Sequence, residues 1–144
     1  MAEPGHAHAK AILALVSDLY FAAKIGDTAK YLGHSIAFAG NGPEFFDSLA
    51  QVRPALIIVD LTLSGMDISV ALDRLKGDPH HAAVPVLGYT THADWKRTGP
   101  LHDRCTRVVT KDTLARSLAD LIRQLSEPHG SPMPTIPTQA DKGR

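Results

Sequence analysis

The chain has 144 residues, 44% of them hydrophobic, which is enough for one domain with a packed core. Its 15 basic and 15 acidic residues balance, so the totals imply no basic surface and argue against nucleic acid as a partner. The one cysteine, Cys105, excludes an internal disulfide and suits a reducing compartment, so we expect a cytoplasmic protein. The apolar run Ala11–Val16 is too short to span a membrane and lacks the flanks of a signal peptide. We therefore expect no membrane contact.

Short apolar runs alternate with helical patterns along the chain. The predicted strands cover 11–16, 34–39, 55–60, 84–89 and 107–110, and the predicted helices cover 20–32, 43–52, 66–75 and 114–125. Gly99-Pro100 should break any long helix in the segment between the last two strands. The run at 55–59 is the most hydrophobic in the chain, which is typical of a central parallel strand covered on both faces. This order predicts an α/β fold, a five-stranded parallel sheet with helices on both faces.

The ends of the chain differ in composition from its middle. Residues 1–9 are small and polar, and we predict a flexible leader. Residues 127–144 contain four prolines among Gly, Ser, Thr and charged groups, and we predict a disordered tail. The folded domain is expected at 10–126, with no second domain.

Chemically useful side chains follow four of the predicted strands. Asp18 comes after the first strand, Asp60 ends the third, Thr90 and Thr91 end the fourth, and Lys111 follows the fifth. The carboxyl ends of parallel strands meet at one edge of a sheet, where ligands bind. Two carboxylates, a hydroxyl and an ammonium group are therefore expected at one edge.

Three segments carry a resemblance to a known family. Leu56-Ile-Ile-Val-Asp60-Leu-Thr-Leu-Ser-Gly-Met-Asp67, Val84-Pro-Val-Leu-Gly-Tyr-Thr90-Thr-His-Ala and Val108-Val-Thr-Lys111 occur in that order. Together they resemble the receiver (response regulator) domain of two-component signalling, over about residues 10–126. The resemblance implies a flavodoxin-like fold and phosphoryl transfer from a histidine kinase or a phosphotransfer protein.

The resemblance also implies a role for each residue at the strand ends. Asp60 would be the phosphoacceptor, and Thr90 and Lys111 would contact the phosphoryl oxygens. Mg²⁺ would be held by Asp18, Asp60 and the backbone carbonyl of Thr62. From the residues alone, Asp18 could instead be only a helix cap, Lys111 only a solvated lysine, and Thr91 could take the place of Thr90.

The sequence departs from the family pattern at several positions. Ser17 stands where a second acid usually precedes Asp18, which would weaken the magnesium site. Ser64 and Asp112 replace prolines, and Val108 replaces an aromatic residue that many receivers carry. Val108, together with a fourth helix shortened by Gly99-Pro100, could alter the usual signalling switch.

Three functions are compatible with these residues. The favoured one is a single-domain response regulator that is phosphorylated on Asp60 and signals by contact with a downstream protein, not by catalysis of its own. The second is a receiver-like docking module that no longer uses phosphate. The third is a phosphatase with Asp60 as nucleophile, which is disfavoured because Thr62 occupies the place of the second acid in such hydrolases.

Overall fold

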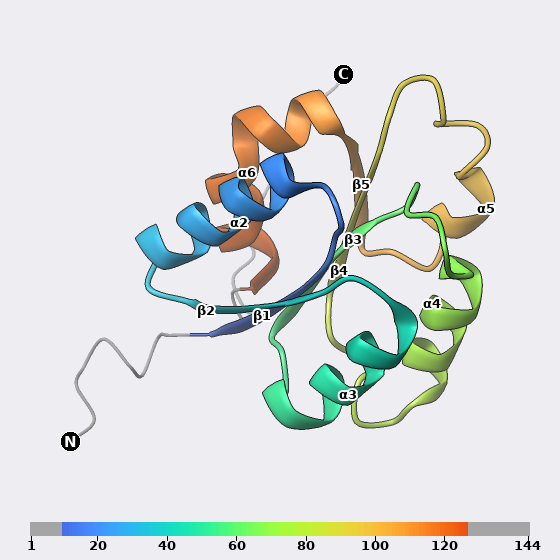
Figure 1. The fold of residues 1–144 in the computed structure, drawn as a ribbon, viewed down its shortest axis with the longest axis horizontal. Helices are drawn as coiled ribbons and strands as arrows, with labels where there is room; N and C mark the ends of the chain where they lie inside the picture. The colour runs from blue at the N-terminus through green and yellow to red at the C-terminus, as the bar shows by residue number, and fades with distance from the viewer. Residues whose placement is uncertain (1–9, 127–144) are drawn as a thin grey trace.

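The computed structural model describes residues 10–126, in which five strands alternate with five helices (Figure 1). The strands are β1 (Ala11–Leu15), β2 (Ser35–Ala39), β3 (Leu56–Asp60), β4 (Val86–Thr90) and β5 (Arg107–Thr110). The helices are α2 (Leu19–Tyr31), α3 (Gly42–Val52), α4 (Ile68–Gly77), α5 (Gly99–His102) and α6 (Lys111–Ser126). The predicted leader (1–9) and tail (127–144) lie outside the described residues.

The strands form a single parallel sheet in the order β2-β1-β3-β4-β5. This confirms the predicted fold class. All five residues of β3 are buried, because this strand is central and is covered on both faces.

Each face of the sheet has its own hydrophobic core. Alternate strand residues, among them Ala14, Ile58 and Tyr89, pack with α2 and α6 on one face. Leu15, Val59 and their alternates pack with α3 and α4 on the other face. Figure 1 shows α2 and α6 together on one side of the sheet and α3 and α4 on the opposite side.

Polar residues directly before three helices cap them. Asp18 accepts hydrogen bonds from backbone amides at the start of α2, Asn41 does so for α3, and Asp67 does so for α4. Two of these caps follow a strand closely, so the sequence that ends the strand also fixes where the next helix begins. Within residues 10–126, no helix is both long enough and apolar enough to cross a membrane.

As Gly99-Pro100 predicted, the segment between β4 and β5 contains no long helix. Gly99-Pro100 does not interrupt a helix there but begins α5, which has only four residues. Proline suits the first turn of a helix, where its missing N–H has no partner to lose. Turns occupy the residues from Thr91 to Thr98 instead of a helix.

Candidate functional site

The sheet brings the predicted strand-end residues to one edge. Asp60 is the last residue of β3 and Thr90 the last of β4, and the two strands are adjacent and parallel. Asp18 precedes α2 and Lys111 is the first residue of α6, at the same carboxyl edge. We call this edge the rim. The sequence predicted the gathering of these segments correctly.

Asp60 lies at the centre of the rim and is 5% exposed. Its Oδ1 accepts hydrogen bonds from the backbone amide of Thr62 at 2.9 Å and from the Thr62 hydroxyl at 2.7 Å. Within the described residues, no hydrogen bond uses Oδ2. The carboxylate is therefore held in place by one oxygen and can present the other to a reactant.

Asp18 divides its two oxygens between the helix and a cation. Oδ1 accepts from the amides of Tyr20 at 2.8 Å and Phe21 at 3.3 Å, so the helix cap that was the alternative role of Asp18 is present. Oδ2 lies 3.9 Å from Lys111 Nζ, which also lies 5.5 Å from the centre of the Phe21 ring. Both members of the ion pair are about one-third exposed, so their attraction is weak and easily exchanged for another partner. In the part of the chain that the structure describes, Lys111 pairs with Asp18 and not with Asp60.

Thr90 is fully buried, and its hydroxyl already has a partner. Thr98 Oγ1 lies 3.2 Å from Thr90 Oγ1, 2.9 Å from the Asp94 carbonyl oxygen and 3.1 Å from His102 Nε2. The His102 ring in turn packs edge-to-face against Trp95, with ring centres 4.7 Å apart. A hydrogen-bonded chain thus runs from the rim to a half-exposed tryptophan, and sequence analysis identified neither Thr98 nor His102.

Thr91 does not share this position. Its hydroxyl donates to Asp94 Oδ2 at 2.9 Å and accepts from the Asp94 amide at 2.9 Å, within the turn that follows β4. Thr90 is therefore the strand-end hydroxyl, as the family motif implied.

Tyr89 is a rim residue that the sequence did not single out. It is fully buried, and its ring lies 5.3 Å from the Phe21 ring. Among the described residues, its hydroxyl is the one buried side-chain oxygen without a hydrogen-bond partner. Burial raises its pKa well above the ordinary range, and the negative charges of Asp60 and Asp18 raise it further.

Comparison with known proteins identifies the fold. No protein-family model matches the chain. Protein PilH of Pseudomonas aeruginosa is 25% identical over 91 residues, covering 60% of this chain and 75% of PilH. The chemotaxis response regulator CheY4 of Vibrio cholerae superposes with a TM-score of 0.70 at 16% identity, covering 80% of this chain and 97% of CheY4. The chain has a receiver-domain fold. The Mn²⁺-bound response regulator Rcp1 superposes with a TM-score of 0.67 at 21% identity, covering 86% of this chain and 99% of Rcp1.

The oxygen atoms at the rim of this receiver fold can be tested against the needs of a divalent cation. No group of three or more His, Cys, Asp or Glu side chains within 10–126 is placed to hold a metal. Mg²⁺ in phosphoryl-transfer sites needs fewer protein ligands, because it keeps several waters and takes one or two carboxylates together with phosphate oxygens. Asp60 and Asp18 each have one oxygen outside the hydrogen bonds described above, and the Thr62 carbonyl follows Asp60 closely. These carboxylate and carbonyl oxygens are of the chemical kind that Mg²⁺ takes as ligands.

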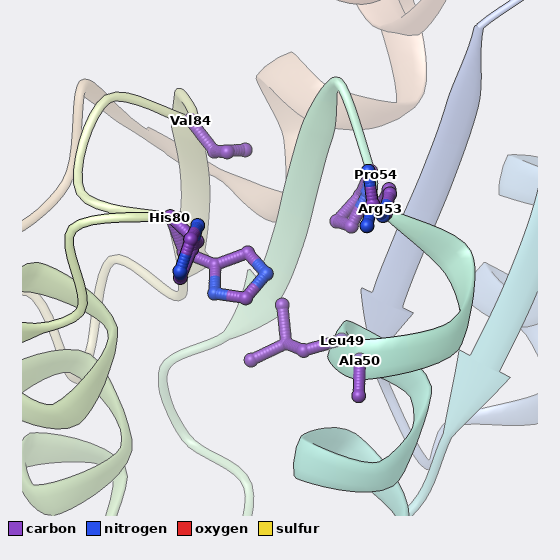
Figure 2. A pocket seen from close by; sticks show the side chains of 7 residues that line it. Leu49, Ala50, Arg53, Pro54, His80 and Val84 are labelled. Carbon is purple, nitrogen blue, oxygen red and sulfur yellow. The ribbon is translucent and has the colours of Figure 1, made fainter.

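A cavity of about 520 Å³ lies elsewhere on the domain (Figure 2). It is lined by Leu49, Ala50, Arg53, Pro54, His80, His81 and Val84. Arg53 and Pro54 come before β3, and Val84 comes before β4, so the cavity is at the amino ends of these strands. It contains none of the predicted site residues and lies at the opposite edge from Asp60.

Proposed function

We propose that this receiver domain accepts a phosphoryl group on Asp60 and signals by binding another protein. The observation that carries the proposal is the state of Asp60: a buried carboxylate fixed through Oδ1, with Oδ2 uncommitted, beside an exchangeable Lys111–Asp18 ion pair. The donor would be a phosphohistidine of a kinase or a phosphotransfer protein. We expect the encounters with the donor and with a downstream protein to occur in the cytoplasm, without membrane or nucleic acid.

The transfer requires a nucleophile and relief of negative charge. Asp60 Oδ2 attacks the phosphorus atom, an O–P bond forms, and the bond between phosphorus and the donor nitrogen breaks with its electron pair left on the imidazole. Lys111 leaves Asp18 and pairs with a phosphoryl oxygen. Mg²⁺, held by Asp18, Asp60 and the Thr62 carbonyl, would supply further charge neutralisation.

The product adds close to two negative charges to the rim at neutral pH. Thr98 Oγ1 donates to Thr90 Oγ1, so the Thr90 hydroxyl can give its own proton to a phosphoryl oxygen and link that oxygen to Thr98. The signal would therefore pass from the phosphoryl group to the turn that contains Trp95. We further propose that the chain has no substrate turnover of its own.

Labelling with a small phosphodonor tests this function. Wild-type protein incubated with phosphoramidate and Mg²⁺ should gain one phosphoryl group in intact mass spectrometry, and Asp60→Asn should gain none, because the amide is not a nucleophile. Asp27→Asn is the matched control, since Asp27 is an exposed carboxylate on α2, and it should label like the wild type. An unlabelled wild type, or a labelled Asp60→Asn variant, would refute the proposal.

A phosphate-independent docking module is the second candidate. The observation in its favour is that, among the described residues, Lys111 pairs with Asp18 and not with Asp60. It predicts no label on the wild type and equal affinity of the wild type and Asp60→Asn for a binding partner. An affinity change of about tenfold or more, equivalent to about 1.4 kcal/mol, would exclude it.

A further inference from the structure

The Tyr89 hydroxyl is an unusual feature of the described core. A buried hydroxyl without a partner costs stability, and native cores rarely contain one without a reason. Phenylalanine would fill the same space without that cost. A tyrosine at this position therefore suggests that the hydroxyl has a partner in another state of the protein.

The position of Tyr89 indicates where that partner would be. Tyr89 is the register partner of Asp60 across β3 and β4, and side chains of paired residues in a parallel sheet point to the same face. Its ring packs on Phe21, the residue whose ring also lies below the Lys111 ammonium group. Tyr89 therefore lies on the same face as Asp60 and packs against Phe21, whose amide bonds to Asp18 and whose ring contacts Lys111.

We propose that Tyr89 is a positioning residue of the phosphoacceptor site, whose hydroxyl donates a hydrogen bond to the oxygens that gather between Asp18 and Asp60 once Asp60 is phosphorylated. This inference rests on the proposed function of Asp60. The donor comes from inside the sheet and supplements the single cation, Lys111, that approaches from α6.

Tyrosine is suited to this role because it remains neutral. Burial and the two nearby carboxylates raise its pKa, so the hydroxyl keeps its proton at neutral pH. A neutral donor adds no charge repulsion and is already desolvated. Its hydrogen bond to an anionic oxygen is then of the stronger, charge-assisted kind.

The experiment compares Tyr89→Phe with the wild type, and uses Tyr20→Phe as a control because Tyr20 is exposed on α2. Each protein is labelled with phosphoramidate and Mg²⁺, the donor is removed, and the decay of the label is followed by mass spectrometry. Tyr89→Phe should lose its phosphoryl group about tenfold faster than the wild type, the value expected for one charge-assisted hydrogen bond. Tyr20→Phe should decay like the wild type.

A stability measurement separates positioning from packing. Unlabelled Tyr89→Phe should unfold at the same or a higher urea concentration than the wild type, because it buries no unpaired hydroxyl. Faster decay together with equal or higher stability supports the proposal. Unchanged decay, or faster decay that comes with lower stability, overturns it.

Two further outcomes keep the inference distinct from the proposed function. If the wild type labels on Asp60 and Tyr89→Phe behaves identically, the inference fails and the proposed function stands. If the wild type does not label at all, both fail. Should Tyr89→Phe not fold, wild-type protein with tyrosine labelled at ¹³Cζ gives the same answer: the buried Tyr89 resonance should shift on phosphorylation, and an unshifted resonance overturns the proposal.

Discussion

The two sides of the rim differ in whether their polar side chains already have hydrogen-bond or ion-pair partners. On the α2 and α6 side, the Tyr89 hydroxyl has no partner among the described residues, Asp60 Oδ2 is uncommitted, and the Lys111–Asp18 contact is long at 3.9 Å. On the α5 side, the Thr90 hydroxyl is buried and bonded to Thr98, which in turn contacts His102. A phosphoryl group would supply partners on the first side and would accept the remaining proton of the Thr90 hydroxyl on the second. The difference suggests that binding occurs on one side and that the response begins on the other.

Removing the Lys111 cation from the α2 and α6 side of the rim should have the largest effect on labelling. Lys111→Ala leaves the phosphoryl group and the two carboxylates without their charged partner, and hydrogen bonds to charged groups are worth about 1.5–3 kcal/mol. We expect the yield of label from phosphoramidate to fall about tenfold or more. Lys30→Ala, an exposed lysine in the last turn of α2, should label normally. Normal labelling of Lys111→Ala would contradict the inference that the phosphoryl group binds on the α2 and α6 side.

Removing the Thr98 hydroxyl should have a smaller effect. Thr98→Val keeps the shape of the side chain but removes the donor to Thr90 Oγ1, so the Thr90 hydroxyl is held less firmly at the strand end. One neutral hydrogen bond is worth about 1 kcal/mol, so we expect the unlabelled protein to lose about 1 kcal/mol of stability and the label to decay about fivefold faster. Thr98→Ser, which keeps the hydroxyl, should match the wild type in both urea unfolding and label decay. A label that decays no faster in Thr98→Val would contradict a role of Thr98 in positioning Thr90.

The smallest effect is expected in the turn that joins β4 to α5. Arg97 and the Thr91 hydroxyl, both bonded to the Asp94 carboxylate, lower the pKa of Asp94 below its ordinary value of 3.8. A lowered pKa means that the contribution of Asp94 to stability is present above about pH 4 and is lost as the pH falls through the lowered value. Trp95, next to Asp94, should report this as a fluorescence change on acidification, and Asp94→Asn should show the altered fluorescence already at pH 7. An Asp94→Asn spectrum identical to the wild type at pH 7 would refute this coupling.

The fold could be predicted from the sequence because its signals are local. The apolar run at 56–59 and the periodic stripe of α2 each specify an element without knowledge of the rest of the chain. The strand-end logic then placed Asp60 and Thr90 correctly, because a parallel sheet brings all its carboxyl ends to one edge. The role of Gly99-Pro100 was harder to predict, because the same dipeptide can end one helix or begin another. Only the turns that precede it decide between the two.

The hydrogen-bond partners at the rim could not be predicted, because they depend on side chains from distant segments. Thr98 lies in a polar stretch that gave no sign of burial, yet it is 1% exposed because its hydroxyl bonds to Thr90. The sequence showed that Tyr89 ends an apolar strand, and a tyrosine there was the available signal of a polar group in the core. It could not show that the hydroxyl lacks a partner, since that depends on the packing against Phe21.

The two oxygens of the Asp18 carboxylate have different partners, and this has an evolutionary consequence. Its Oδ1 begins α2, and its Oδ2 faces Lys111. Asparagine, serine or threonine could take over the first task at little cost to the helix, while removing the charge that the second task needs. A substitution at this residue could therefore abolish phosphorylation without any folding defect to select against it. A descendant protein would then keep the fold and lose the phosphorylation.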